Sequence, residues 1–400
     1  MKSIEFVVKK KLCTGCGICS SIFHSKVEIQ RSDYNRPFVK ESLNNLEEKI
    51  FNKICPGINQ SSILSKNIHP VWGPIESADI GYSNDADIRF LGSSGGIVTQ
   101  TLLHALESKL VDLVVQIASD KNNPIENIVK ISKNKNDLIE STGSRYSPAS
   151  PLINIVQIIK KNPNKKIAFV GKPCDCVALR NLMSIDDEVK KSIILIVSFF
   201  CAGTPSRNGV KKVLDSLHYD NKKRVTDFYY RGKGWPGKTT LIQGRSINSM
   251  DYSESWGNLL GPTIQSRCKL CADGTGEVAD IVSADVWKCD SRGYPIFTES
   301  DGQGLVLART DLGRKLVEQM ISGDLITVFP YNINDLSNVQ ITQFERKSTI
   351  LARVLAKMIG DTTFIKLPRQ RVFKVFFNVS IYKQARVFAG SLMRVIKGKM

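Results

Sequence analysis

A run of three cysteines near the N-terminus constrains the fold of this chain more than any other feature. Cys13, Cys16 and Cys19 follow one another at three-residue intervals, with Gly15 and Gly17 between them. Three thiolates at this spacing, on a loop loosened by glycine, can bind three corners of an iron–sulfur cube. Structural zinc is the alternative, but it prefers two separated Cys-x-x-Cys or Cys/His pairs. The run therefore predicts a [4Fe–4S] site in a small N-terminal domain.

A cube needs a fourth thiolate, and the candidate is Cys55. It precedes Pro56, which repeats the Cys-Pro ending of ferredoxin cysteine runs. The usual spacing is short, whereas 35 residues separate Cys19 from Cys55 in this chain. We nevertheless expect Cys55 to be the fourth ligand.

Six further cysteines are dispersed along the chain. Cys174 follows one buried-strand pattern, Cys201 follows another, and Cys268 and Cys271 form a Cys-x-x-Cys pair. Four thiols are enough for a second four-thiolate site, but buried cysteines also serve as small apolar fillers. Spacing leaves these two alternatives open. The other two cysteines are expected to be fillers or bystanders: Cys176 and Cys289.

The hydrophobic pattern after residue 72 alternates between strands and helices. Strand patterns cover 110–118, 166–170 and 193–199, and helical periodicity covers 96–109, 151–161 and 174–183. This alternation predicts an α/β layer with a largely parallel sheet. A mixed region follows, with a helix at 207–217, strands at 225–230, 239–243, 281–284 and 305–309, and a helix capped by Asp311. Before residue 72 we expect a strand at 4–8 and a helix at 41–54.

These patterns predict an α/β (α+β) fold in four parts. We expect a ferredoxin-type 4Fe-4S domain over 1–72, an α/β domain over 73–206, a mixed domain over 207–340 and a helical basic tail over 341–400. The Pro- and Gly-containing stretch at 69–74 is the expected linker after the first domain.

Two loops of small residues are candidates for ligand binding. GSSGG at 92–96 runs into a helix, where free backbone N–H groups suit a phosphate, although such loops also simply cap helices. TGSRYS at 142–147 adds the cation Arg145 and the ring of Tyr146. GKGWPGKT at 232–239 matches the P-loop pattern, but strand-like residues follow Lys238 and Pro236 lacks an N–H. We therefore reject the interpretation of this segment as the P-loop of a nucleotidase.

Charge and cysteine content narrow the class of protein. A reducing cytoplasm does not favour ten half-cystines, so clustered cysteines there bind metal or do redox work.

Nine of the 18 net positive charges lie in 362–400, which has no Asp or Glu, so nucleic-acid binding by the body is disfavoured. In this tail the basic residues alternate with apolar ones, as in a membrane-surface helix; a solvated helix is the alternative.

The sequence contains no apolar stretch of the ~20 residues that a membrane helix needs, and its first residues do not match a signal peptide. We therefore expect a soluble, cytoplasmic protein, with the tail allowing peripheral contact with the inner membrane surface.

Seven motifs follow one another between about residues 10 and 320. They are CTGCGIC, SSGGIVTQTLLHALESKLVD, TGSRYSP, IAFVGKPCDCVALR, FFCAGTPS, RGKGWPGK and RCKLCADGTGEVADIVSADVW. In this order they resemble the coenzyme F(420) hydrogenase/dehydrogenase beta-subunit family, whose relatives include 7-hydroxymethyl chlorophyll a reductase. The sequence departs from the family pattern at SSIF after the first run, at Ala272 and at Ala284-Asp285, and these departures leave the substrate open.

The resemblance implies an iron–sulfur oxidoreductase with FAD in the 73–206 domain. It implies a second [4Fe–4S] cluster on Cys174, Cys201, Cys268 and Cys271. By position it assigns these residues to FAD: Ser94, Gly95, Gly96, Thr99, Gly143, Ser144, Arg145, Tyr146 and Lys238.

The expected function is electron transfer through the two clusters and FAD to a small-molecule substrate. The donor would be a ferredoxin-like or other redox protein, or a deazaflavin, and the chain would work in a larger reductase complex; no nucleic acid is expected. Lys238 and Asp285 are the weak candidates for a catalytic proton donor. The alternative is a docking or scaffold subunit in which the clusters only staple the fold.

Overall fold

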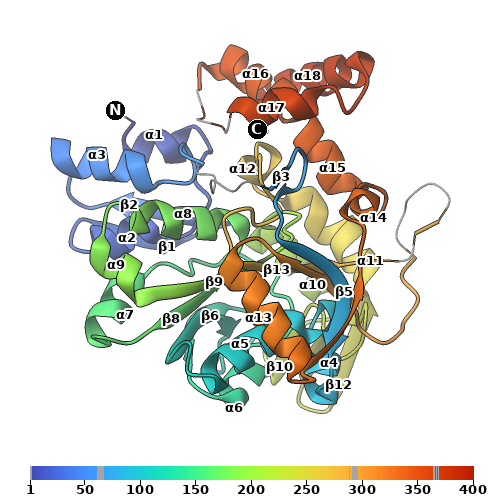
Figure 1. The fold of residues 1–400 in the computed structure, drawn as a ribbon. Helices are drawn as coiled ribbons and strands as arrows, with labels where there is room; N and C mark the ends of the chain where they lie inside the picture. Colours follow the sequence, from blue (N-terminus) through green and yellow to red (C-terminus); the bar gives the residue numbers. More distant parts are fainter. Residues whose placement is uncertain are drawn as a thin grey trace.

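An eight-stranded sheet forms the centre of the computed structural model, which describes residues 2–60, 67–287, 289–290, 296–363, 365, 367 and 369–400 (Figure 1). The strand order is β15-β5-β14-β13-β9-β8-β6-β7. The strands are β5 (Ser77–Ser83), β6 (Leu113–Ser119), β7 (Asn127–Ser132), β8 (Ile167–Gly171), β9 (Ile193–Phe199), β13 (Ile281–Asp285), β14 (Gly304–Ala308) and β15 (Ile326–Pro330).

The sheet is mixed, so the expectation of a largely parallel sheet is wrong. Only the pairs β6–β8, β8–β9 and β9–β13 are parallel, and the other four pairs are antiparallel. The short connection from β6 to β7 makes a hairpin, because it contains no crossover helix to return the chain in the same direction. Strands β13, β14 and β15 come from the segment after residue 206, so one sheet unites the two middle segments of the chain.

Both faces of the sheet are buried, which explains the near-continuous apolar runs of its central strands. Val114, Ala168 and Leu195 point to one face, where α5 (Ile97–Glu107) and α13 (Asp311–Ser322) pack. Their neighbours in sequence point to the other face, where α7 (Ile155–Lys161), α8 (Pro173–Met183) and α9 (Asp187–Ser192) lie. The cap of α13 is Thr310, whose side chain accepts from Gly313 N; the expected cap, Asp311, is the first helical residue.

The N-terminal segment is small and packs onto the second face. It contains α1 (Ile4–Lys9), α2 (Ile18–Ile22), the hairpin of β1 (Val27–Arg31) and β2 (Asn35–Val39), and α3 (Asn45–Ile54). The strand expected at 4–8 is wrong, since these residues form α1. Ser3 caps this helix by accepting from Phe6 N, and Ile4 and Val7 are buried on one side of it, as helical spacing requires.

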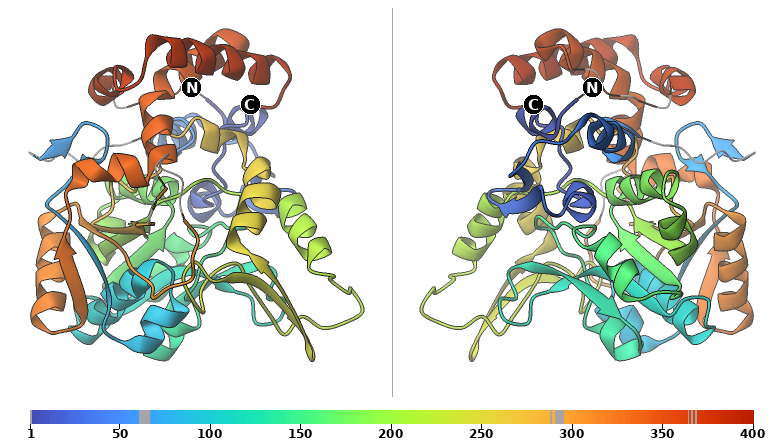
Figure 2. Two further views of the ribbon diagram at one scale, coloured as in Figure 1. Left: turned by 90° about the vertical axis from the view of Figure 1, so that its right-hand side faces the viewer. Right: turned by 90° about the vertical axis from the view of Figure 1, so that its left-hand side faces the viewer.

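A second core lies under a three-stranded sheet that projects from the body (Figure 2). The sheet contains β10 (Asp227–Tyr229), β11 (Lys238–Gln243) and β12 (Ser246–Asp251), and α10 (Arg207–Ser216) precedes it. Lys238 begins a strand and not a helix, which confirms the rejection of the P-loop. Short elements complete this region: α11 (Tyr252–Glu254), a π-helix (Ser255–Leu260) and α12 (Ser266–Lys269).

The C-terminal segment after β15 folds into helices, of which the last three form a layer at the top of Figure 1. They are α14 (Leu336–Val339), α15 (Ile341–Ser348), α16 (Ile350–Asp361), α17 (Arg369–Phe376) and α18 (Ile381–Ile396). The end of the chain packs against α1, where Lys11 Nζ donates to the carbonyl of Gly398. Among the helices described, none has the length and apolar content to cross a bilayer.

Candidate functional site

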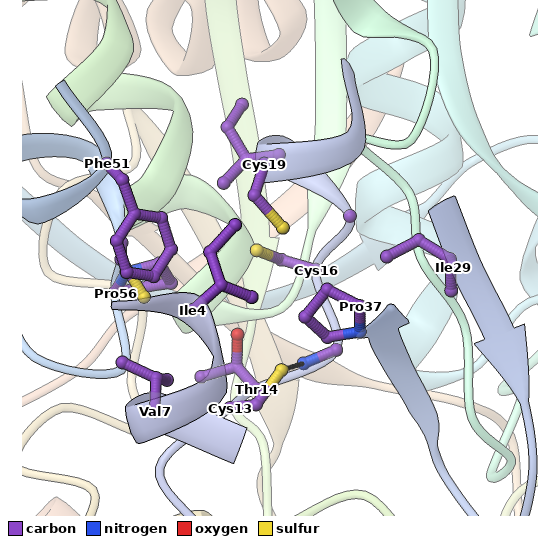
Figure 3. Close-up of a pocket in the computed structure, with 14 residues that line it drawn as sticks. Ile4, Val7, Cys13, Thr14, Cys16, Cys19, Ile29, Pro37, Phe51 and Pro56 are labelled. Atoms are coloured by element: carbon purple, nitrogen blue, oxygen red, sulfur yellow. Dashed lines mark hydrogen bonds between the residues drawn. The ribbon is translucent and has the colours of Figure 1, made fainter. Parts of the chain in front are cut away.

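The four N-terminal cysteines line one small pocket (Figure 3). Cys13, Cys16 and Cys19 come from the loop and first turn that join α1 to α2, and Cys55 ends α3. In Figure 3 the sulfur atoms of Cys16 and Cys19 point into the same space. Apolar side chains line the rest of this pocket, among them Ile4, Val7, Ile29, Pro37 and Phe51.

Glycine allows the cysteine loop to fold this tightly. Gly15 and Gly17 have φ angles of 78° and 88°, which side-chain-bearing residues rarely adopt. A Cβ atom on Gly17 would also lie 2.9 Å from the backbone of Ile153. The loop is further fixed from outside, because Leu152 N donates to Cys16 O over 3.0 Å and Ser150 Oγ donates to Gly15 O over 2.8 Å.

The protein alone does not favour four thiolates in this pocket. Burial, with the nearby Asp175 carboxyl and Cys13 thiol, raises the pKa of Cys16 to about 12. Burial and the neighbouring cysteines also raise the pKa of Cys19 and Cys55. Deprotonated sulfurs therefore need positive charge placed among them.

The arrangement of the four cysteine thiols bears on which positively charged group, a zinc ion or an iron–sulfur cluster, they could bind. No three His, Cys, Asp or Glu side chains in the described ranges converge closely enough for a single metal ion. A cube takes its thiolates at well-separated corners, whereas zinc draws its ligands to one point. The four thiols around this largely apolar pocket form a donor set of the kind that an iron–sulfur cluster uses.

The four dispersed cysteines also come together. Cys174 lies in the first turn of α8, Cys201 follows β9, and Cys268 and Cys271 lie in and just after α12. Burial raises the pKa of Cys201 to about 12, and the thiols of Cys268 and Cys271 add to the increase. The Cys174 thiol interacts in the same way with Cys201 and Cys268. Thr204 N donates to Cys268 Sγ over 3.4 Å, so the site offers four thiols and a backbone donor to sulfur.

The remaining two cysteines have other surroundings. Cys176 is completely buried in α8, where its Sγ lies 3.5 Å from Gly171 O. Cys289 Sγ lies 3.5 Å from Trp287 O. Burial is the largest cause of the raised pKa of both thiols.

Arg267 and Gln265 connect the two cysteine groups directly. The Arg267 side chain, 2% exposed, donates to the carbonyls of Pro56 and Gly57, the two residues that follow Cys55. It also donates to Leu270 O over 2.8 Å, within the Cys268–Cys271 turn. Gln265 Nε2 donates to Thr14 O over 3.1 Å, between Cys13 and Cys16. Arg267 and Gln265 therefore hold the two cysteine-bearing segments together.

The two small-residue loops predicted to bind a ligand lie side by side. Ser93 Oγ and Ser144 Oγ are 2.8 Å apart and share a hydrogen bond. The first loop turns through positive φ angles at Ser94, Gly95 and Gly96. A Cβ atom on Gly96 would lie 2.6 Å from Ile88 O, so only glycine fits there.

A cavity of about 490 Å³ lies between these loops and extends to the second cysteine group. Its lining includes Ser94, Thr99, Gly143 and, at another point, Cys201. The first turn of α5 also lines it and has no side-chain cap, so its N–H groups are available to an anionic ligand. The volume lies within the range of small-molecule and cofactor sites.

Three of the residues predicted to bind a ligand are placed differently from the rest, and one of them, Gly95, is not among the residues that line the cavity. Arg145 lines the cavity, but its guanidinium already donates to Asn127 Oδ1, Phe228 O and Pro124 O at 2.7–2.8 Å. Its donors tie strands together and are not free for a phosphate. Lys238 is not among the cavity-lining residues; its side chain is 62% exposed and its Nζ lies 3.8 Å from Asp251.

Sequence reasoning missed the aromatic wall of the cavity. Tyr146 was predicted, but Tyr252, Trp256 and Trp287 also line the space. The rings of Tyr146 and Trp256 are 4.9 Å apart, and Trp235 stacks on Trp287 at 4.3 Å with an interplanar angle of 12°. Apart from Tyr252 and Trp256, these residues lie far apart in the sequence, and of the rings that were missed only Trp235 and Trp287 lie within two of the seven motifs.

A buried ion pair supports this wall. Arg231, 2% exposed, donates to both carboxylate oxygens of Asp285, at 2.6 and 3.0 Å. Asp285 also accepts from Trp235 Nε1 at 2.8 Å and from Ser94 Oγ at 2.9 Å. Burial acts to raise the pKa of Asp285, but the Arg231 charge and these hydrogen bonds outweigh it and hold the pKa below its usual value. Asp285 thus joins the glycine loop to the aromatic wall.

Comparison with known proteins identifies the family. Residues 80–157 match the model for the N-terminal part of the coenzyme F420 hydrogenase/dehydrogenase beta subunit, and residues 164–333 match the model for its C-terminal part. The chain belongs to this beta-subunit family. The family implies redox electron transfer and confirms the resemblance seen in the motifs.

Individual relatives of this family member are distant. The beta subunit of coenzyme F420 hydrogenase from Methanococcus voltae is 24% identical over 66% of this chain and 87% of its own length. The chloroplastic 7-hydroxymethyl chlorophyll a reductase from Oryza sativa subsp. japonica is 20% identical over 77% of this chain and 61% of its own length. In fold, the chain is similar to one in the F420-reducing [NiFe] hydrogenase complex from Methanosarcina barkeri. The TM-score is 0.57 at 18% identity, over 75% of this chain and 98% of that one.

Proposed function

We propose that this protein is an iron–sulfur flavoprotein oxidoreductase. It would bind two [4Fe–4S] clusters and one FAD and pass electrons between a redox protein or deazaflavin and a small-molecule substrate. The observation that carries the proposal is the cavity, because its lining includes both the glycine loop and Cys201. A ligand held by that loop would therefore lie beside the second cysteine group.

The clusters would supply single-electron transfer, and the flavin would couple single electrons to hydride transfer. The protein's own residues would bind and orient these groups. The N–H groups of the first turn of α5 would bind phosphate, while Ser94 is held in place by Asp285. Tyr252 and Trp287 would exclude water and stack against planar rings.

Asp285 is better suited to positioning than to proton donation. Its lowered pKa keeps it ionised, and its two oxygens already accept from Arg231, Trp235 and Ser94. Lys238 lies outside the cavity lining. Neither of the two expected proton donors therefore keeps that role in the proposal.

The order of the sites suggests the direction of electron flow. The N-terminal group occupies the small outer segment, and Arg267 joins it to the second group, which borders the cavity. A redox protein would dock at the N-terminal segment, and a larger reductase complex is the expected setting, since the related solved chain belongs to such a complex.

The test is the composition and spectrum of protein purified without oxygen. We expect about eight iron and eight labile sulfide per chain, one flavin, and visible absorption that bleaches on reduction. Iron and sulfide without flavin would instead favour a cluster-stapled scaffold subunit. A preparation with zinc alone would contradict the redox function.

A further inference from the structure

The C-terminal helices carry an unusual amount of exposed apolar surface. Eight large apolar side chains in this region are 40–82% exposed: Leu355, Ile359, Phe373, Phe377, Ile381, Tyr382, Met393 and Ile396. They lie beyond residue 333, where the match to the family models ends. Clustered apolar surface of this kind marks an interaction site more often than chance exposure does.

On α18 most of the exposed apolar residues form one stripe, and Ile381, the first residue of the helix, lies about 40° outside it. Tyr382, Ala385, Ala389, Met393 and Ile396 are all exposed, and at 3.6 residues per turn they lie within an arc of about 80°. The buried residues of the helix lie on the opposite side: Gln384, Ser391 and Val395. The stripe is therefore the outer face of a helix whose inner face is packed.

Packing between helices brings α16 to the same surface. A Cβ atom on Gly360 would lie 2.6 Å from Val395, so the two helices touch closely at this point. Ile359, the residue before Gly360, is 66% exposed, and Ile396, the residue after Val395, is 72% exposed. Exposed apolar residues of both helices therefore lie next to the point where the helices touch.

The charge of this layer is predominantly positive, and its one acidic residue, Asp361 at the end of α16, is paired with Lys357. Residues 362–400 contain nine Lys and Arg and no Asp or Glu. Arg386 and Lys397 lie about 20–40° beyond the edge of the α18 stripe, on one flank. Both are exposed, as is Lys374 on α17, and no ion pair is recorded for these three among the residues that the structure describes.

We propose that the layer formed by α16–α18 binds the surface of an anionic lipid membrane. Apolar side chains beside unpaired cations match an interface where acyl chains meet anionic headgroups. A second copy of the same face is a poor alternative, because two like-charged surfaces would repel. The helices would lie on the membrane and not cross it.

The test is co-sedimentation of the full-length protein with vesicles of phosphatidylcholine alone or mixed with phosphatidylglycerol. Binding should require the anionic lipid. It should fall as salt rises from about 0.01 M to about 1 M, because the Debye length falls from about 30 Å to about 3 Å. Each basic residue near the surface should contribute about fivefold to the partition coefficient.

Substitutions of exposed residues leave the packed face intact and are preferable to deletion. One set removes apolar contacts: Tyr382→Ser, Met393→Ser and Ile396→Ser. A second set removes charge: Lys374→Gln, Arg386→Gln and Lys397→Gln. Matched controls change exposed residues elsewhere: Ile185→Ser, Ile247→Ser and Phe329→Ser for the first set, and Lys160→Gln, Lys161→Gln and Lys191→Gln for the second.

We expect the charge set to weaken vesicle binding on the order of 100-fold, the apolar set to weaken it at least tenfold, and both controls to bind like wild type. Thermal melts should show all four proteins folded. The proposal is overturned if wild type ignores anionic vesicles at low salt, if it binds neutral vesicles equally well, or if the controls weaken binding as much. Loss of self-association or of binding to an acidic protein, without any vesicle binding, would assign the surface to that partner.

Discussion

Replacing Asp285 with Asn should show that the buried ion pair contributes more to the free energy of unfolding than an exposed ion pair does. The amide keeps the size of the carboxylate but removes its charge, and it turns an N–H₂ group toward the donors of Arg231. That guanidinium is 2% exposed and would lose its counter-ion. Removing one partner of a buried pair costs about 3–5 kcal/mol, a large part of a typical stability of about 5–15 kcal/mol.

The chain offers a matched control for this substitution. Asp227 pairs with Lys233 at 3.1 Å, and both side chains are 41% exposed. Asp227→Asn should therefore cost about 0–1 kcal/mol. Urea unfolding followed by tryptophan fluorescence would measure both variants, since Trp235 lies against Asp285.

A double variant tests whether the cost arises from the unpaired charge. Arg231→Met with Asp285→Leu removes both buried charges and should recover much of the lost stability. Flavin content of the double variant should be low, because Ser94 lacks its acceptor. The reasoning fails if Asp285→Asn costs no more than Asp227→Asn, or if the double variant is as unstable as the single one.

Three further outcomes follow from the same contacts. The folded-state pKa of Asp285 is depressed below its ordinary value of about 3.9, so the stability from its ion pair is complete at neutral pH and is lost as pH falls through the folded-state pKa. The stability difference between wild type and Asp285→Asn, measured by urea unfolding, should therefore shrink only below about pH 4. Arg267→Met should leave three buried carbonyls without their charged donor, costing about 3–5 kcal/mol, and iron analysis should show losses from both cysteine groups. Lys238→Met should leave flavin content unchanged because its side chain lies outside the cavity lining, whereas Gly96→Ala should lower it through the clash with Ile88 O; flavin absorbance after gel filtration measures both.

The local hydrophobic pattern of the sequence predicted the buried helices and strands well. The strand expected at 193–199 is β9, and the helices expected at 174–183 and 207–217 match α8 and α10 within one residue at each end. These segments have continuous apolar runs or clear helical spacing, so burial and local preference agree. The strand expected at 4–8 is wrong because Ile4, Val7 and Val8 are β-branched and look strand-like, whereas the Ser3 cap favours a helix.

Long-range contacts limited the prediction of the site. The sequence indicated Cys55 by its Cys-Pro pair, and the structure brings it into the pocket of Cys13, Cys16 and Cys19. The sequence could not show that the Arg145 guanidinium donates its hydrogen bonds to backbone carbonyls, because those carbonyls belong to distant parts of the chain. The aromatic wall was missed for the same reason, since its rings meet only after the three-stranded sheet packs against the main one.

The most direct test of the account compares Cys16→Ser with Cys268→Ser in anaerobically prepared protein. For each variant, the flavin content and the rate of flavin reduction are measured with a small diffusible reductant and with a ferredoxin-type donor. Cys16→Ser should keep near-normal flavin and react with the small reductant, but not with the protein donor, because its docking cluster is lost. Cys268→Ser should lose flavin and stability, because its site adjoins the cavity through Cys201. Equal flavin loss in both variants, or full activity of Cys16→Ser with the protein donor, would contradict the proposed sequence of electron transfer.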